Sequence, residues 1–280
     1  MSHILTVKEA KKLMDREDVI FVDCRFDLKD NQKGKEAYIN AHIPWAVYFD
    51  LERHMSGKVR KQGGRHPLPD PQSFSKLLGE AGITSETIVI GYDENRSTMS
   101  ARLLWLMKFF AHKNVYLLDG GMDAWKAEGL PLENGETVAH GVEEYPYQLQ
   151  QAMVCGMEEV QKEKDKHAVA LLDSREFERF AGWVEPIDAK AGHIPGAVQI
   201  TWHDVYTSEG KWKPANELRE LYKEISESEK VIVYCGSGVT AASNVIGLWE
   251  AGYRDVQLYV GSFSDWISRT ENPVGTLSKD

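Results

Sequence analysis

An internal duplication constrains the fold of this chain more than any other feature of its sequence. The stretch "FVDC", followed later by "AHIP", returns in the second half as "LLDS", followed by "GHIP". Further along, "ETIVIGYD" parallels "EKVIVYC", and "VYLLDGGMDAW" parallels "VQLYVGSFSDW". Four blocks therefore recur in the same order. Since a long repeat of this kind marks a structural unit that occurs twice, the sequence predicts two similar domains.

The repeat also predicts where the domains begin and end. We expect a first domain over residues 1–133 and a second over residues 151–280. The segment between them, residues 134–150, is polar with scattered glycine and proline and has no long apolar period. Such a composition is typical of a linker that lies on the protein surface.

Within each half, short apolar runs alternate with helical patterns. The runs "VIFVD", "TIVIGYD" and "VYLLDGG" do not alternate with polar residues, which is typical of parallel strands buried on both faces. "SARLLWLMKFFA" and "ASNVIGLWEAG" have helical spacing, and Gly252 is suited to end the second helix. The sequence thus predicts an α/β fold in which each half is a mainly parallel sheet flanked by helices. In such sheets, functional sites lie at the carboxyl ends of the strands.

Charge and cysteine content exclude several classes of function. The formal net charge of −10 disfavours nucleic acid and anionic membranes as partners, because both bind basic patches. The start of the chain shows no secretory pattern, and the most apolar window, residues 103–111, is short and contains Lys108. Cys24, Cys155 and Cys235 are far apart, which argues against a disulfide framework and a zinc site. We therefore expect a cytoplasmic protein with reduced cysteines and no bound metal.

Cys235 lies between a predicted strand, "VIVY", and a predicted helix that begins near Ala241. Gly236 and Gly238 allow a tight turn whose backbone N–H groups point inward, which makes an anion-binding loop at a helix N-terminus. The same loop would stabilise a thiolate, the nucleophilic form of cysteine. The alternative is that Cys235 only ends a buried strand, because cysteine is among the most buried residue types. The two glycines favour the nucleophile.

The first half of the chain provides an internal comparison. Alignment of the repeats places Asp93 opposite Cys235, followed by "ENRSTMSA" instead of "GSGVTAAS". The first half therefore lacks both the cysteine and the glycines, and we expect it to be catalytically inactive. A cysteine-dependent phosphatase would need an arginine six positions after the cysteine, where this chain has Ala241. Phosphoryl transfer is thus disfavoured.

Two tandem α/β halves, "GHIPGA", and a cysteine loop between strand and helix together resemble the rhodanese family of sulfurtransferases. The resemblance implies that Cys235 carries sulfur as a persulfide, without an organic cofactor or a metal. It implies that the donor is a small anion, thiosulfate or 3-mercaptopyruvate, and that the acceptor is cyanide, a small thiol or a thioredoxin-like protein. By the same resemblance Arg179 binds the donor together with N–H groups of the loop, contributed by residues Gly236, Gly238, Val239 and Thr240.

The resemblance bears on the choice of donor in two opposite ways. Ser237, His66 and Glu52 occupy positions that imply a proton relay, which would protonate the enolate left when 3-mercaptopyruvate loses its sulfur. Against this, Ile187 stands where mercaptopyruvate enzymes usually carry a second arginine, and Lys190 is the nearby candidate to replace it. The donor stays open, with 3-mercaptopyruvate ahead.

Two other functions are compatible with the same residues. Cys235 could receive sulfur only from a partner protein, in a relay or regulatory module, or the chain could be a phosphatase or arsenate reductase on the same fold. Three other polar residues are expected to be structural: Arg175 is at least as suited to an ion pair with Asp173 as to a ligand, and His42 and His193 precede turns.

Overall fold

The computed structural model describes residues 2–94, 96, 98–226 and 230–279 and divides the chain into two compact units. The first unit consists of Met1–Gly57, Leu68–Gln150 and Tyr206–Trp212, and the second of Lys58–Pro67, Gln151–Val205 and Lys213–Asp280. Each unit thus contains a short segment that lies, in sequence, within the other half. The segment of residues 58–67 includes His66, a residue of the predicted proton relay.

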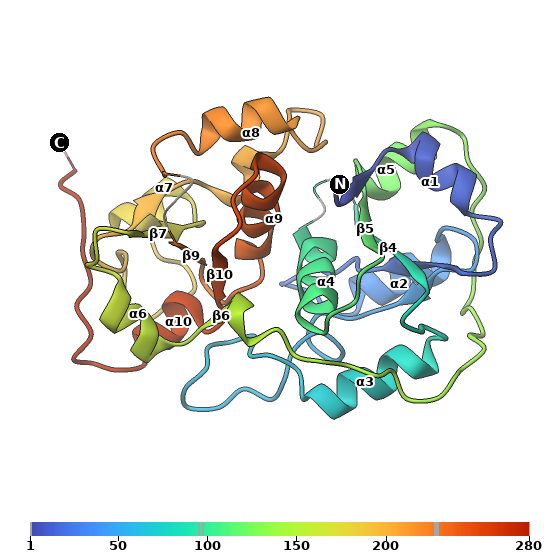
Figure 1. Cartoon of the computed structure of the whole chain (residues 1–280), viewed down its shortest axis with the longest axis horizontal. Coiled ribbons are helices and arrows are strands. Elements are labelled where there is room, and N and C mark those ends of the chain that lie inside the picture. Colours follow the sequence, from blue (N-terminus) through green and yellow to red (C-terminus); the bar gives the residue numbers. More distant parts are fainter. Residues whose placement is uncertain (1, 95, 97, 227–229, 280) are drawn as a thin grey trace. The chain divides into compact units, whose positions relative to one another are not determined.

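The first unit is a parallel sheet with helices packed against it (Figure 1). Its strands are hydrogen-bonded in the order β1-β5-β4-β2-β3, and every pair is parallel. The strands are β1 (Ile4–Leu5), β2 (Val19–Asp23), β3 (Val47–Tyr48), β4 (Ile88–Tyr92) and β5 (Val115–Leu118). The helices are α1 (Val7–Leu13), α2 (Lys33–Asn40), α3 (Pro71–Glu80), α4 (Thr98–Phe109) and α5 (Gly121–Ala127).

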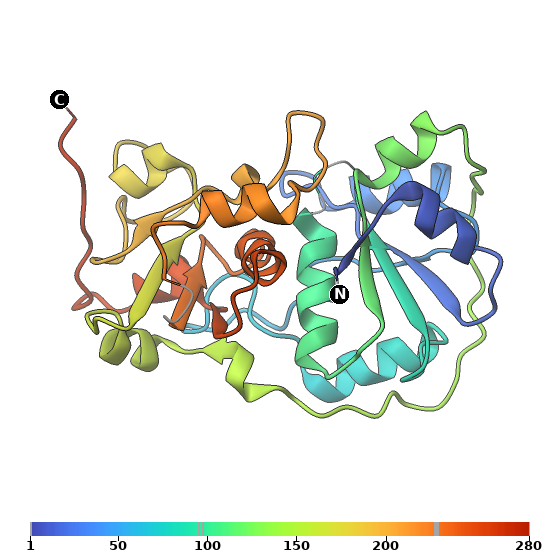
Figure 2. The same cartoon turned by 45° about the horizontal axis from the view of Figure 1, so that its top comes forward.

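Both faces of this sheet are buried, which explains the unbroken apolar runs in its strands. Because successive side chains of a strand point to opposite faces, Ile90 and Tyr92 pack on one side, in a core with Trp125 of α5. Gly91 lies on the other side, where an added Cβ would be 3.1 Å from Leu103 of α4. Helix α4 contacts β4 and β5 along this second face, as Figure 2 shows.

The second unit repeats this architecture. Its strands are hydrogen-bonded in the order β6-β10-β9-β7-β8, again all parallel. The strands are β6 (Val154–Cys155), β7 (Val169–Asp173), β8 (Val198–Gln199), β9 (Lys230–Tyr234) and β10 (Val256–Tyr259). The α-helices are α6 (Met157–Glu163), α7 (Phe177–Ala181), α8 (Ala215–Leu221), α9 (Ala241–Ala251) and α10 (Ser262–Trp266), and the 3-10 helices are η1 (Gln151–Met153) and η2 (Trp202–Val205). The predicted α/β fold with two parallel sheets is confirmed.

Helix α9 follows the cysteine loop and packs against β9 and β10 (Figure 1). Nine of its residues are buried, so the helix is enclosed on nearly its whole circumference. It ends at Gly252, whose φ of 109° belongs to the left-handed region, and the Gly252 N–H donates to the carbonyl of Leu248. The end of the helix was therefore predicted correctly from the glycine.

An aspartate–arginine pair is buried at the same place in each unit, and both pairs are structural. Arg25 donates to Asp23 and to the carbonyl of Ala41, while Arg175 donates to Asp173 and to the carbonyl of Gly192. In each pair the Nη2 atom lies 2.6 Å from the carboxylate oxygen. Since the pair also occurs in the half without the cysteine, its role is to join the end of a strand to the following loop.

The histidines before the two Ile-Pro turns are structural as well. The Nδ1 atom of His42 is 2.8 Å from the carbonyl oxygen of Tyr38, and that of His193 is 2.8 Å from the carbonyl oxygen of Phe180. Each imidazole also stacks on the aromatic ring of that same partner. Among the residues that the structure describes, no helix has the length and apolar character needed to cross a membrane.

Candidate active site

Cys235 lies directly after β9, the central strand of the second sheet, at its carboxyl end. Its side chain is buried, with 2% of the residue exposed. The N–H group of Gly238 donates a hydrogen bond to the Cys235 Sγ atom over 3.2 Å. A backbone N–H stabilises negative charge on the sulfur that accepts it, so this contact favours the thiolate, which is the reactive form.

The tight turn after Cys235 depends on glycine at position 238. Gly238 has a φ of 78°, in the left-handed region, and an added Cβ would lie 2.2 Å from the carbonyl oxygen of Val260. Any side chain there would force the turn away from the end of β10. Val239 is buried in the same turn and Thr240 precedes the first residue of α9. The loop predicted from the sequence is therefore present, and the hydrogen bond to Sγ comes from Gly238.

The start of α10 holds the cysteine loop from the other side. The N–H groups of Phe263 and Ser264 donate to the carbonyl oxygens of Cys235 and Gly236, each over 3.0 Å. In a trans peptide the N–H group points opposite to the preceding carbonyl, so the N–H groups of Gly236 and Ser237 are directed away from α10. The same arrangement occurs in the first unit, where the Met122 N–H donates to the Asp93 carbonyl.

Ser262 carries backbone strain at this site. Its φ of 54° is unusual for a residue with a side chain, and the corresponding residue of the first unit is Gly121, with a φ of 56°. The Ser262 hydroxyl accepts the Cys235 N–H over 3.1 Å and donates to the Tyr259 carbonyl over 2.9 Å. A glycine at this position would have no hydroxyl, so the serine adds two hydrogen bonds that hold the Cys235 backbone N–H against the end of β10.

His66 and Ser237 meet, although they are far apart in sequence. The His66 Nδ1 atom is 2.8 Å from the Ser237 Oγ atom, and both residues are buried. This contact lies within the second unit, because residues 58–67 belong to it. Ser237 is the second residue after Cys235, and a histidine hydrogen-bonded to a hydroxyl is a group that can carry a proton. Two of the three residues of the predicted relay are therefore in contact.

Glu52, the third residue of the predicted relay, belongs to the first unit. Its side chain is exposed and accepts a hydrogen bond from the Asn31 side chain over 3.4 Å. The role of Glu52 stays a prediction.

Arg179, the predicted donor-binding residue, is held by two carboxylates. Its Nε atom donates to Glu185 over 3.1 Å, and its Nη2 atom donates to Glu185 over 2.8 Å and to Asp188 over 3.0 Å. Burial by itself would raise the pKa of Glu185, but the hydrogen bonds from Arg179 and from backbone N–H groups outweigh it and lower that pKa. For Asp188 burial dominates and raises the pKa. The guanidinium is thus fixed in place beside the loop.

Arg65 and Asp188 are part of this site and were not predicted from the sequence. The Arg65 Nη1 atom donates to the Asp188 carboxylate, so that Asp188 joins Arg65 to Arg179. Arg65 is therefore the second cation that contacts Asp188 among the described residues, and the role of Lys190 stays a prediction. The sequence did offer one indication of Arg65, because this residue directly precedes the predicted relay residue His66. However, nothing in the stretch "GGRHP" indicates that the segment packs against the second unit.

Asp93 occupies the position of Cys235 in the first unit. Its Oδ2 atom accepts the N–H groups of Met99 over 2.7 Å and Ser100 over 3.1 Å, at the start of α4. Burial raises the pKa of Asp93 to about 6, because the charged carboxylate is removed from water. The first unit therefore has an acid group of its own where the second has the cysteine.

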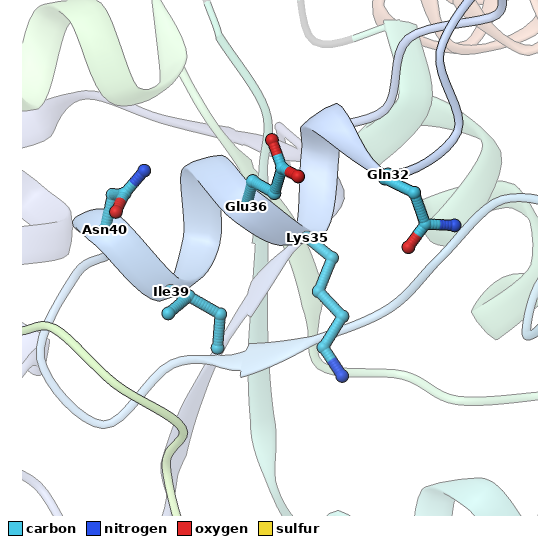
Figure 3. Close-up of a pocket in the computed structure, with 5 residues that line it drawn as sticks. All are labelled: Gln32, Lys35, Glu36, Ile39 and Asn40. Atoms are coloured by element: carbon cyan, nitrogen blue, oxygen red, sulfur yellow. The ribbon is translucent and has the colours of Figure 1, made fainter.

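Other features of the described residues do not compete with the cysteine loop. An open hollow on the first unit is lined by side chains along α2, which are drawn in Figure 3, and it includes none of the predicted site residues. Cys24 and Cys155 are buried, and burial raises the pKa of both thiols. Among the described residues, no group of three or more His, Cys, Asp or Glu side chains could hold a metal ion.

Comparison with known proteins agrees with this geometry. A family model for the Rhodanese-like domain matches residues 6–128 and again residues 156–269. The chain belongs to the rhodanese family. Its activity is therefore that of a sulfurtransferase, an enzyme that uses a sulfur donor and a sulfur acceptor. The predicted duplication and the predicted family are both confirmed.

Three relatives illustrate the match. A protein of Pseudomonas aeruginosa, provisionally named a 3-mercaptopyruvate sulfurtransferase, is 38% identical over an alignment of 280 positions that covers 98% of each chain. SseB of Mycobacterium tuberculosis, provisionally named a thiosulfate sulfurtransferase, is 35% identical, with coverage of 97% of this chain and 96% of SseB. The crystal structure of SseA from Escherichia coli, described as a 3-mercaptopyruvate sulfotransferase, superposes with a TM-score of 0.81 at 28% identity, covering 94% of this chain and 100% of SseA.

Proposed function

We propose that this rhodanese-family enzyme takes sulfur from 3-mercaptopyruvate, ahead of thiosulfate, onto the thiol of Cys235. The observation that carries the proposal is the Gly238 N–H group, which donates to the Cys235 Sγ atom at the end of the central strand. The aligned residue of the first unit, Asp93, has a carboxyl group in place of a thiol and cannot carry sulfur as a persulfide. Cys24 and Cys155 are buried, and among the described residues their sulfur atoms are hydrogen-bonded to backbone carbonyl oxygens instead, so they are less suited to react.

The first step forms one bond and breaks one bond. The Cys235 thiolate attacks the sulfur atom of 3-mercaptopyruvate, a new sulfur–sulfur bond forms, and the carbon–sulfur bond of the donor breaks. The electron pair of that bond leaves with pyruvate as its enolate. The donor's S–H proton stays on the new persulfide, Cys235–S–SH, which then loses it. Protonation of the enolate to pyruvate takes up one proton, and ionisation of the persulfide releases one, so the step needs no proton from outside.

His66 and Ser237 are the residues that we propose to move this proton. The His66 Nδ1 atom is 2.8 Å from the Ser237 Oγ atom, and Ser237 is the second residue after Cys235 in the same loop. Thiosulfate would give up its outer sulfur to form sulfite, a stable anion that needs no proton. A histidine–serine pair at the loop therefore favours 3-mercaptopyruvate as the donor.

In the second step an acceptor removes the outer sulfur. Cyanide or a thiolate attacks the outer sulfur atom of the persulfide, the sulfur–sulfur bond breaks, and the Cys235 thiolate returns. Thiocyanate or a new persulfide is the product, and no oxidant is consumed. A small thiol or a thioredoxin-like protein is the proposed acceptor, in the reducing cytoplasm, which suits a chain whose cysteines are free.

Intact-protein mass spectrometry tests the proposal directly. The protein is incubated with 3-mercaptopyruvate or thiosulfate in the absence of an acceptor, and we expect it to gain the mass of one sulfur atom. Cys235→Ser should gain none, whereas the matched variants Cys24→Ser and Cys155→Ser should load like the unchanged protein. Loading of Cys235→Ser, or no loading by either donor, would overturn the proposal. Loading only from a persulfidated protein would indicate the relay or regulatory module instead.

A further inference from the structure

The segment of residues 58–67, which belongs to the second unit, is a basic arm. It contains Lys58, Arg60, Lys61 and Arg65 and no aspartate or glutamate, whereas the whole chain has a formal net charge of −10. Four cations in so short a segment produce a local positive potential on a protein that is acidic as a whole. The basic arm is thus suited to a negatively charged partner.

Three of these cations are available to such a partner. Lys58, Arg60 and Lys61 are exposed, and within the described part of the chain none of them has a carboxylate partner. Arg65 differs, because it takes part in an ion pair. By contrast, several cations elsewhere in the second unit each contact a carboxylate: Lys164, Lys166, Lys223, Lys230 and Arg269. Val59, which is 68% exposed, adds an apolar side chain to the same surface.

Hydrogen bonds fasten the basic arm to α10, the helix that also holds the cysteine loop. The Gly63 N–H donates to Asp265 over 2.6 Å, and the Arg65 N–H donates to the Ser264 hydroxyl over 3.3 Å. The other oxygen of Asp265 accepts the Tyr259 hydroxyl over 2.8 Å, so this carboxylate is held from both sides. Asp265, which is buried, therefore anchors the basic arm.

This anchor places the exposed cations beside the cysteine loop. Further along the basic arm, the His66 Nδ1 atom lies 2.8 Å from the Ser237 Oγ atom of that loop. Lys61 is two residues before Gly63, so the Cα atoms of these two residues are at most about 7 Å apart. The positive charges thus border the loop on which the persulfide forms.

The aligned repeats link the basic arm to the unit that carries the cysteine. Ala124, which has no side-chain acceptor, stands opposite Asp265, and Leu118 stands opposite Tyr259. The first unit therefore lacks the carboxylate anchor and the hydroxyl that supports it. Since the anchor occurs where the cysteine occurs, we relate the basic arm to the reaction of Cys235.

We propose that the basic arm is a docking surface for an acidic protein whose cysteine accepts sulfur from Cys235. This inference rests on the proposed function. The acceptor thiolate attacks the outer sulfur of the Cys235 persulfide, the sulfur–sulfur bond breaks, the acceptor becomes a persulfide, and the Cys235 thiolate returns. A small donor does not span cations spread along an exposed segment, whereas a protein surface covers several of them at once. Complementary charges at the rim of a contact speed association and select among partners.

Sulfur transfer to short cysteine peptides tests this inference. One acceptor peptide has its cysteine flanked by glutamates, and the other has glutamines in their place. The ratio of kcat/KM for the acidic and the neutral peptide cancels any change in the loading of Cys235. The arm variant combines the substitutions Lys58→Gln, Arg60→Gln and Lys61→Gln. We expect it to lower the acidic-to-neutral ratio about 10-fold, because three attractions between exposed charges are lost.

A matched variant with the same change in net charge is the control. It combines three substitutions of exposed lysines at α1, Lys8→Gln, Lys11→Gln and Lys12→Gln. This variant should leave the acidic-to-neutral ratio unchanged. An unchanged ratio in the arm variant, or an equal fall in the control variant, would overturn the inference.

Salt and a small thiol supply two further readouts. Raising the ionic strength from about 0.01 M to about 1 M shortens the Debye length from about 30 Å to about 3 Å, so the ratio of the unchanged protein should fall to that of the arm variant. Turnover with dithiothreitol, a small neutral thiol, should be the same in the arm variant and the unchanged protein. If dithiothreitol turnover falls as much as turnover of the acidic peptide, the arm acts on Cys235 itself and the inference is wrong.

Thiol–disulfide exchange provides a readout that needs no sulfur transfer. Each peptide is supplied as its mixed disulfide with thionitrobenzoate; the Cys235 thiolate attacks the peptide sulfur, a new disulfide forms, and thionitrobenzoate leaves. The acidic-to-neutral rate ratio should again fall about 10-fold in the arm variant. If Cys235 fails to load sulfur, the proposed function is refuted, yet this ratio still decides whether the basic arm recognises an acidic partner. Binding of single-stranded RNA that is lost in the arm variant would overturn the choice of an acidic protein.

Discussion

Replacement of Asp93 by asparagine should change how stability depends on pH. Burial raises the pKa of Asp93 from the ordinary 3.8 to about 6, so the folded protein binds this proton more tightly than the unfolded chain. The ionised carboxylate therefore destabilises the folded state, and this cost appears as the pH rises from about 4 to about 6. Asparagine keeps an oxygen that can accept the N–H groups of Met99 and Ser100 but does not ionise.

The expected magnitude follows from the shift in pKa. One pKa unit corresponds to about 1.4 kcal/mol, so the full cost of ionising Asp93 is about 3 kcal/mol. Of this, about 2 kcal/mol should develop between pH 4.5 and pH 7. The gain in unfolding free energy of Asp93→Asn over the unchanged protein should therefore be about 2 kcal/mol larger at pH 7 than at pH 4.5, which means that the variant is relatively more stable at pH 7.

Denaturant unfolding at the two pH values measures this difference. Because the two proteins differ only at residue 93, other titrating groups cancel when the free energies are subtracted. Sulfur loading of Cys235 serves as the control and should be unchanged in Asp93→Asn. If the difference in unfolding free energy is the same at pH 4.5 and pH 7, the carboxylate does not titrate in this window and the reasoning is refuted.

Two further predictions concern the cysteine loop. His66→Ala should slow turnover of 3-mercaptopyruvate by about 100-fold while it changes turnover of thiosulfate much less, because only the first reaction needs a proton; equal effects on both donors would contradict the relay. Gly238→Ala should abolish sulfur loading, because the new Cβ would lie 2.2 Å from the Val260 carbonyl oxygen and displace the N–H group that donates to Cys235. Mass spectrometry measures the loading, and circular dichroism shows whether the variant is folded; full loading of a folded Gly238→Ala would rule out the role given to this turn.

The fold was predictable because its signals are local and occur twice. Buried parallel strands produce unbroken apolar runs, and the second copy of each run supports the interpretation of the first. The same logic identified Cys235, since its loop begins where a central strand ends and its counterpart is Asp93. The ion pairs at Asp23 and Asp173 could also be predicted from the sequence, because the arginine is only two residues after the aspartate in each pair.

The extent of the units was less predictable. The repeat suggests a single domain boundary near residues 134–150. In the structure, however, residues 58–67 belong to the second unit and residues 206–212 to the first. These segments lie outside the repeated blocks and carry no apolar period. Their placement depends on contacts with residues far along the chain, such as those of Gly63 and Arg65 with α10.

The sequence by itself determined the duplicated α/β architecture, the nucleophile candidate at a strand end and the loss of that candidate in the first half. Only the tertiary structure decided which residues surround Cys235. His66 and Arg65 reach the loop from residues 58–67, and Asp188 joins Arg65 to Arg179 across the site. Periodicity records which face of an element is buried, but it does not record which distant polar side chains meet there. Hydrogen bonds and ion pairs between distant segments form only once the backbone has brought those segments together.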